Sequence, residues 1–125
     1  EILRKLASGE AVETNPYPDV LAIKDGSEVT RVNVSDIQWI DAAGDYMCVH
    51  ALDGMHIMRK TMKELEQELN PQLFVRVHRS AIANIRYVKK LVSHISGEYH
   101  LILNNDTELK VSRSHRDKVK AAMKM

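Results

Sequence analysis

Short apolar–polar alternations, each closed by a tight-turn signal, are the feature that most constrains how this chain can fold. From Val20 onwards, turn signals that contain glycine recur at residues 25–28, 42–45, 52–54 and 96–97. The runs beside them alternate with a period of two residues, which places successive side chains on opposite faces of an extended strand. Regularly spaced short strands predict antiparallel sheets arranged as a sandwich or an open barrel, rather than alternating β and α units.

Two helices are predicted within this strand-rich pattern. Thr61 and Glu64 have the spacing of a capping box, and the apolar residues that follow recur at helical spacing until the Asn-Pro pair at residues 70–71. The Met and Leu stripe of this helix is interpreted as core-facing rather than as a cofactor site. Ser114, with Asp117 three positions later, has the form of a weaker capping box and predicts the start of a short C-terminal helix.

The remaining elements are read from the same patterns. Residues 79–84, R-S-A-I-A-N, predict one tight helical turn, whereas residues 87–95 and 98–103 predict a hairpin. Residues 107–111 predict the closing strand. Asn84 is interpreted as a side chain that holds backbone in place. Together these patterns predict a mostly β domain.

Residues 1–19 differ in composition from the rest of the chain. Ile2, Leu3 and Leu6 have the spacing of one face of a short helix, and the stretch that follows, G-E-A-V-E-T-N-P-Y-P-D, carries two prolines two residues apart. This composition is typical of an interdomain linker. Because the first residue is not methionine, we expect a fragment in which residues 1–19 link a missing upstream domain to one compact domain at residues 20–125.

The bulk composition fits a soluble, cytoplasmic protein. Hydrophobic residues make up 44% of the chain, which is enough for a core. The sequence has no apolar run of bilayer-spanning length and no signal-peptide pattern at its start. The single cysteine, Cys48, excludes an internal disulfide and fits a reducing compartment.

The net charge of +1 hides an uneven distribution along the chain. Residues 1–73 hold 7 Lys and Arg against 13 Asp and Glu, a balance of −6, whereas residues 74–125 hold 11 against 4, a balance of +7. A basic half favours one face for a polyanion and another for solvent or a partner, although chance segregation of surface charge gives the same balance.

The usual catalytic and metal-binding motifs are missing. Six histidines and Cys48 invite a metal site, but none stands in a C-x-x-C or H-E-x-x-H arrangement. Cys48 and His50 share one strand face, which makes a chance ligand pair the alternative to a small buried cysteine. There is no G-x-S-x-G elbow and no glycine-rich phosphate loop. We therefore expect no metal, no cofactor and no enzyme activity.

Two basic clusters interrupt the strand pattern in the second half of the chain. Residues 74–88, F-V-R-V-H-R-S-A-I-A-N-I-R-Y-V, contain His-Arg-Ser at 78–80, and residues 109–118, L-K-V-S-R-S-H-R-D-K, contain Ser-Arg-Ser at 112–114. Arginines flanked by small hydroxyl residues at strand ends suit phosphate binding and the reading of base edges. They do not suit acid–base catalysis, because arginine keeps its proton in proteins.

Four segments resemble those of a known family. They are I-Q-W-I-D-A-A-G-D-Y at residues 37–46, T-M-K-E-L-E-Q-E-L-N-P at 61–71, F-V-R-V-H-R-S-A-I-A-N-I at 74–85 and L-K-V-S-R-S-H-R at 109–116. In this order and spacing, the chain resembles the LytTR family of bacterial DNA-binding domains over residues 20–123.

The resemblance implies a mostly β, LytTR-like multi-sheet sandwich of short antiparallel strands, with one connecting helix and a short C-terminal helix. It implies that loop residues, not a recognition helix, enter successive major grooves of double-stranded DNA. Family members are transcription factors, commonly response regulators of two-component systems with an N-terminal receiver domain. We therefore expect a sequence-specific output domain that follows a receiver or sensor domain, occupies tandem repeats one helical turn apart and dimerises weakly or only on DNA.

The candidate DNA-binding residues come from three segments of the chain. Arg113 is the first candidate for a base contact and Arg79 the second, with a surface salt bridge as the alternative for Arg113. Arg76 and Arg116 are assigned to phosphates. The full set is Asp45, Tyr46, Met47, Arg76, His78, Arg79, Ser80, Ser112, Arg113, Ser114 and Arg116.

Several of these candidates have a second interpretation. Asp45 can accept a hydrogen bond from a cytosine amino group or cap its own turn. Tyr46 and Met47 can pack on a base or sugar, and Tyr46 can equally be ordinary strand packing. His78 can donate to phosphate or brace its loop, and Ser114 can be a helix cap.

Two other functions compete with duplex binding. RNA or single-strand binding commonly uses several exposed aromatic residues on a sheet face, and aromatic residues are 5% of this chain. A protein-interaction module would use the acidic half or an edge strand.

Overall fold

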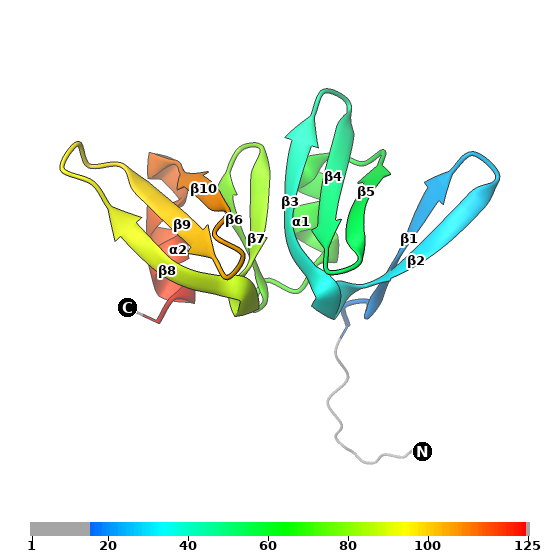
Figure 1. Ribbon diagram of the computed structural model, residues 1–125, viewed down its shortest axis with the longest axis horizontal. Coiled ribbons are helices and arrows are strands. Elements are labelled where there is room, and N and C mark those ends of the chain that lie inside the picture. The colour runs from blue at the N-terminus through cyan, green and yellow to red at the C-terminus, as the bar shows by residue number, and fades with distance from the viewer. Residues whose placement is uncertain (1–15, 125) are drawn as a thin grey trace, which may run out of the picture.

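The computed structural model describes residues 16–124, so the helix predicted at Ile2, Leu3 and Leu6 and most of the predicted linker lie outside the described residues. The described chain forms three antiparallel sheets, which confirms the predicted mostly β class (Figure 1). The sheets have the strand orders β1-β2, β5-β4-β3-β7-β6 and β10-β9-β8. The strands are β1 (Val20–Asp25), β2 (Glu28–Asn33), β3 (Ile37–Ala43), β4 (Tyr46–Ala51), β5 (Gly54–Met58), β6 (Phe74–His78), β7 (Ala81–Asn84), β8 (Val88–Ser93), β9 (Tyr99–Leu103) and β10 (Glu108–Val111).

Short helices join the strands. The α-helices are α1 (Met62–Glu68) and α2 (Arg116–Ala122), and the 3-10 helices are η1 (Val34–Asp36), η2 (Ile85–Tyr87) and η3 (Arg113–His115). The predicted capping box of α1 is confirmed, because the Glu64 amide donates to Thr61 Oγ1 at 3.0 Å and the Thr61 amide donates to Glu64 Oε1 at 2.9 Å. Within residues 16–124, no helix is long and apolar enough to cross a membrane.

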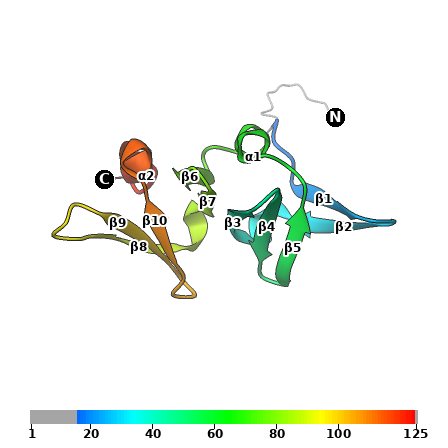
Figure 2. The ribbon, with the colours of Figure 1, turned by 90° about the horizontal axis from the view of Figure 1, so that it is seen from above.

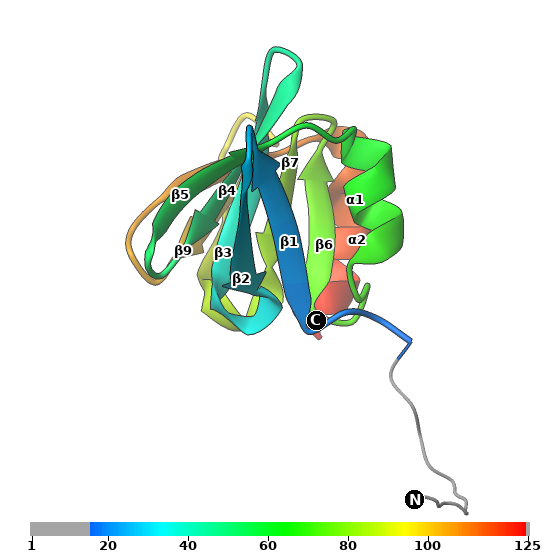
Figure 3. The same cartoon turned by 90° about the vertical axis from the view of Figure 1, so that its right-hand side faces the viewer.

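Two hydrophobic cores share the five-stranded sheet. One core lies between this sheet, the β1–β2 hairpin and α1, and it contains Ile37, Ile40 and Leu65. The other lies between β6, β7, the three-stranded sheet and α2, and it contains Leu101 and Val119. The two α-helices lie on the same side of the molecule, as Figure 3 shows.

The predicted helical turn at residues 79–84 is wrong, because Ala81–Asn84 form strand β7. This strand lies between β3 and β6, with Ala83 opposite both Trp39 and Val75. All four of its residues are buried, so it lacks the apolar–polar alternation that marks a half-buried strand.

The C-terminal helix is confirmed, but its predicted start at Ser114 is wrong. Helix α2 begins at Arg116 with His115 at its N-cap position, and Ser114 lies inside η3. The chain turns helical directly after Ser112, so Ser114 is already inside a turn of helix and does not cap one.

Candidate nucleic-acid interface

Three loop segments far apart in the sequence meet at one edge of the molecule. We call residues 43–46, 78–80 and 112–116 the three-loop edge. The segments lie at the upper edge in Figure 1, and Figure 2 looks down onto them. Two backbone hydrogen bonds fix their spacing: the Ala42 amide donates to the Ser80 carbonyl at 2.9 Å, and the Ser112 amide donates to the Val77 carbonyl at 2.9 Å. The sequence-predicted clusters therefore share one surface.

Arg76 braces the β6–β7 turn from below. Its Nε donates to the His78 carbonyl at 3.2 Å and its Nη2 to the Arg79 carbonyl at 2.6 Å. Its Nη1 donates to Glu66 Oε1 in α1 at 3.1 Å. The guanidinium thus joins two successive carbonyls at the start of the turn to a helix, which a lysine ammonium without this planar fork cannot do.

His78 and Ser80 complete the β6–β7 turn from above. The Ser80 amide donates to His78 Nδ1 at 3.3 Å, and Ser80 Oγ lies 3.0 Å from the same nitrogen. Because Nδ1 is the acceptor, the ring proton is on Nε2. Arg79, between them, is exposed, and its side chain makes no hydrogen bond or ion pair with any residue in 16–124. The turn therefore presents a free guanidinium on a fixed backbone.

In η3, as in the β6–β7 turn, serine groups contact the Nδ1 atom of a histidine ring next to an exposed arginine. His115 Nδ1 lies 2.6 Å from Ser112 Oγ and 3.2 Å from Ser114 Oγ, so both hydroxyls converge on one ring nitrogen. Desolvation, followed by the nearby charges of Arg76 and Lys118, lowers the pKa of His115 and favours its neutral ring, which suits hydroxyl donors. Arg113 is exposed, and its side chain has no bonded partner in the part of the chain that the structure describes.

The Arg116 side chain, unlike that of Arg113, contacts other residues. Its guanidinium carbon lies 5.3 Å from the centre of the Tyr99 ring, and Nη1 donates to the Gly97 carbonyl at 3.3 Å. Lys120 lies over the same ring, with Nζ 4.9 Å from its centre. As predicted, Arg116 stands in the first turn of the C-terminal helix.

The β3–β4 turn supplies the third segment. Gly44 has φ 63°, a left-handed conformation that favours glycine, and Asp45, which follows it, is exposed. Tyr46 is 46% exposed, whereas Met47 is 6% exposed and belongs to the core. The expectation that Met47 contacts DNA is corrected, because the strand period points it away from the Tyr46 face.

Arg59 is a residue of this edge that sequence reasoning missed. It follows β5 directly, and the pairing of Met47 with Met58 brings it beside Tyr46. Its guanidinium carbon lies 5.6 Å from the centre of the Tyr46 ring. The available signal was an arginine immediately after a strand end, the same signal that marked Arg79.

Cys48 and His50 follow Tyr46 along one face of β4. His50 stacks on Trp39 with ring centroids 3.9 Å apart, and its Nε2 lies 2.8 Å from Asp41 Oδ1. Cys48 is partly exposed rather than buried, and desolvation with the nearby Asp41 charge raises the pKa of its thiol. Among residues 16–124, no group of three His, Cys, Asp or Glu side chains is placed to hold a metal ion.

Comparison with known proteins agrees with this geometry. The model of the LytTr DNA-binding domain family matches residues 27–124, which is most of the chain. The chain belongs to the LytTr DNA-binding domain family. Among solved structures, a LytTr DNA-binding domain of a putative methyl-accepting/DNA response regulator from Bacillus cereus has a TM-score of 0.77 at 21% identity, covering 86% of this chain and 99% of that one. It shows that the two share the LytTr fold.

Curated relatives of this LytTr domain are regulators. The chain is 27% identical over 100 residues to the sensory transduction protein LytT of Bacillus subtilis, covering 80% of this chain and 42% of that protein. It is 29% identical over 107 residues to the transcriptional regulatory protein LytR of Staphylococcus aureus, covering 86% of this chain and 44% of that protein. The chain thus spans less than half the length of these relatives.

Proposed function

We propose that this LytTr domain binds double-stranded DNA with sequence preference through its three-loop edge, as the output domain of a transcriptional regulator. The observation that carries the proposal is the state of Arg79 and Arg113. Both are exposed, and neither side chain makes a hydrogen bond or ion pair within residues 16–124, whereas side chains and main-chain hydrogen bonds hold their backbone in place. Such an arginine breaks no existing bond when it binds, and its fixed backbone loses little conformational freedom.

Arg79 and Arg113 are assigned to base edges. Guanine presents two acceptors in the major groove that match the two parallel donors of a guanidinium, and such a bidentate contact distinguishes guanine from other bases. The two arginines come from neighbouring segments, because the Ser112 amide bonds to the Val77 carbonyl. Their proximity supports the assignment of both side chains to nearby positions of one site.

The other cations and hydroxyls of the edge are assigned to the DNA backbone. The Arg116 guanidinium is held over the Tyr99 ring. A side chain held in this way suits a phosphate contact, which fixes the register of the domain on the duplex, better than a base contact. His78 has its Nε2 proton free to donate to a phosphate, and the hydroxyls of Ser112 and Ser114 lie beside Arg113. Arg76, by contrast, is assigned to holding the turn.

The β3–β4 turn gives the edge its one acidic contact. Asp45 is exposed and adjoins Tyr46, whose ring lies near the Arg59 guanidinium. A carboxylate among cations accepts from a cytosine amino group and repels a nearby phosphate, so it favours one register over others. We assign Asp45 and Tyr46 to the base and sugar side of the site and Arg59 to phosphate.

One small domain with a few loop contacts buries limited surface, so we propose that two copies occupy tandem half-sites about one helical turn apart. Association of the copies is weak or depends on DNA. The sensory transduction and transcriptional regulatory relatives are more than twice as long as the segment they share with this chain, which supports a receiver or sensor domain upstream in the complete protein.

A matched set of alanine variants tests the proposed surface. Arg86 is also exposed, but it follows β7 at the end opposite to the three-loop edge, so Arg86→Ala removes the same charge from another place. Arg79→Ala and Arg113→Ala should each weaken duplex binding by about five- to 150-fold, which corresponds to roughly 1–3 kcal/mol. Arg86→Ala should change it by less than about twofold.

Fluorescence anisotropy with labelled duplex and with the matching single strand gives the readout, and thermal melts show that each variant is folded. Equal losses for all three variants would mean that only net charge matters. Tighter binding to the single strand than to the duplex would replace the proposal by single-strand binding.

A further inference from the structure

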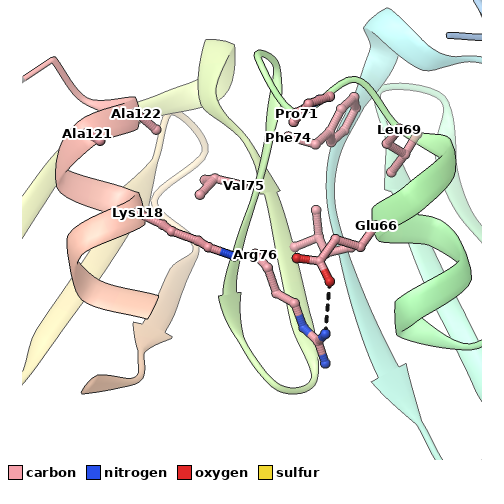
Figure 4. A pocket seen from close by; sticks show the side chains of 10 residues that line it. Glu66, Leu69, Pro71, Phe74, Val75, Arg76, Lys118, Ala121 and Ala122 are labelled. Carbon is pink, nitrogen blue, oxygen red and sulfur yellow. Dashed lines mark hydrogen bonds and ion pairs between the residues drawn. The ribbon is translucent and has the colours of Figure 1, made fainter. Parts of the chain in front are cut away.

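A groove separates α1 from α2 on the helical side of the molecule (Figure 4). It has a volume of about 390 Å³, and β6 lies between its two helical walls. Its apolar lining is contributed by Leu69, Phe74, Val75, Ala121 and Ala122. Sites for small organic molecules commonly have this size, a mostly apolar wall and a few polar groups.

The polar end of the groove carries an excess of positive charge. Lys118 extends from α2 across the groove towards Arg76 (Figure 4), and its ammonium makes no hydrogen bond or ion pair with residues 16–124. Glu66 enters from α1 and accepts one hydrogen bond from Arg76 at 3.1 Å. The polar end of the groove thus holds two cations and one carboxylate, a net charge of +1, which one further negative charge would neutralise.

We propose that this groove binds a small apolar carboxylate. The hydrocarbon part would replace water on the apolar lining, and the carboxylate would pair with the ammonium of Lys118 and share the guanidinium of Arg76. An uncharged ligand would leave Lys118 unpaired, and a cation would be repelled by both basic groups. The charge of the groove therefore selects a monoanion.

The same guanidinium links the groove to the three-loop edge. Arg76 holds the carbonyls of His78 and Arg79, the last residue of β6 and the first residue of the turn that presents the Arg79 side chain. A carboxylate in the groove would attract the guanidinium away from these carbonyls and from Glu66, so we propose that it loosens the turn. Occupancy should then weaken DNA binding; this second step rests on the proposed function, whereas binding in the groove does not.

Octanoate is a suitable probe, with 1-octanol as its uncharged control of equal chain length. NMR titration of the full chain should shift the methyl signals of Leu69, Val75 and Ala122 with octanoate, and at several-fold higher concentration with octanol. Lys118→Gln should weaken octanoate binding by about two- to fivefold, and Glu66→Gln should strengthen it by a similar factor, because one removes an attraction and the other a repulsion.

Opposite changes from two neutralising variants distinguish the groove from general adsorption. Ala121→Phe fills the groove from an exposed position and should abolish the shifts without lowering the melting temperature. If octanoate causes no shifts at these methyls, or binds all three variants like the wild type, the site does not exist.

A second titration tests the link to DNA. Octanoate should lower the affinity for duplex DNA in the wild type but not in Ala121→Phe. Binding in the groove with unchanged DNA affinity would overturn the link and leave the site. A wild type that binds octanoate but no duplex would instead refute the proposed function.

Discussion

Replacing Arg76 by alanine separates two roles that its sequence position allows, a phosphate contact and a brace for the β6–β7 turn. The guanidinium donates to Glu66 Oε1 at 3.1 Å and to the carbonyls of His78 and Arg79 at 3.2 and 2.6 Å. Arg76→Ala removes all three hydrogen bonds and leaves the Glu66 carboxylate without its cation.

The magnitude follows from how deeply these groups lie. The side chains of Arg76 and Glu66 are 20% and 37% exposed, so their ion pair is partly hydrated. Each of the three hydrogen bonds is then worth about 0.5–1 kcal/mol, less than a fully buried charged bond. We expect Arg76→Ala to lower the free energy of unfolding by about 1–3 kcal/mol and the melting temperature by roughly 4–12 °C.

The salt dependence of DNA binding distinguishes the two roles. A phosphate contact releases counterions, so its loss should flatten the slope of log affinity against log salt by about 0.9. A brace releases none, so Arg76→Ala should lower affinity at every salt concentration with nearly the same slope. Anisotropy titrations between about 50 and 200 mM salt measure this slope.

Arg76→Lys is the matched variant, because it keeps the charge but loses the planar fork that reaches Glu66 and the carbonyls together. We expect it to melt and bind between Arg76→Ala and the wild type. An Arg76→Ala protein that melts like the wild type and loses about 0.9 from its salt slope would refute the brace and restore the phosphate contact.

Three further variants test side chains that stabilise the fold around the three-loop edge. Asn84 is 1% exposed, donates to the Ile37 carbonyl at 2.8 Å and accepts from the Arg86 amide at 3.0 Å, so Asn84→Ala should cost about 1–3 kcal/mol in chemical denaturation without changing the salt slope. Thr61→Ala removes the capping box of α1 and should cost about 1 kcal/mol in the same assay; no loss would show that α1 is held by packing alone. The pKa of His115 is lowered in the folded protein, so the unfolded chain takes up a proton at a higher pH than the folded chain. The free energy of unfolding should therefore fall as the pH drops from 7 through about 6.5, the pKa of an unperturbed histidine. His115→Gln should remove this part of the fall, which melts at a series of pH values measure.

Local chemistry made much of the fold predictable from sequence. The capping box at Thr61 and Glu64 and the turn at Asp25-Gly26 depend on neighbours within four residues, and both are as predicted. Strand β7 was not predictable in this way, because its burial comes from β3 and β6 on either side, which are brought there by the fold. Asn84, at its end, was nevertheless interpreted correctly as a residue that holds backbone.

The exposed arginines of the candidate site were predictable because their exposure follows from their position in the sequence. Arg79 and Arg113 stand in short polar breaks after apolar strands, and both are exposed. The partners of Arg76 were not predictable, because Glu66 reaches it from another element across the fold. The error at Met47 has a simpler cause: two adjacent strand residues cannot share a face, so an exposed Tyr46 already implied a buried Met47.

The most direct test of DNA reading by the three-loop edge compares Arg113→Ala with Arg116→Ala in a selection of bound duplexes from a random pool. Arg113 is free, whereas Arg116 is held over Tyr99. Arg113→Ala should relax base preference at one position and cost about 1–3 kcal/mol on the preferred site, and Arg116→Ala should weaken all sequences alike and flatten the salt slope. Reversed profiles would exchange the two roles, and two wild-type profiles with wild-type affinity would show that this edge does not bind DNA.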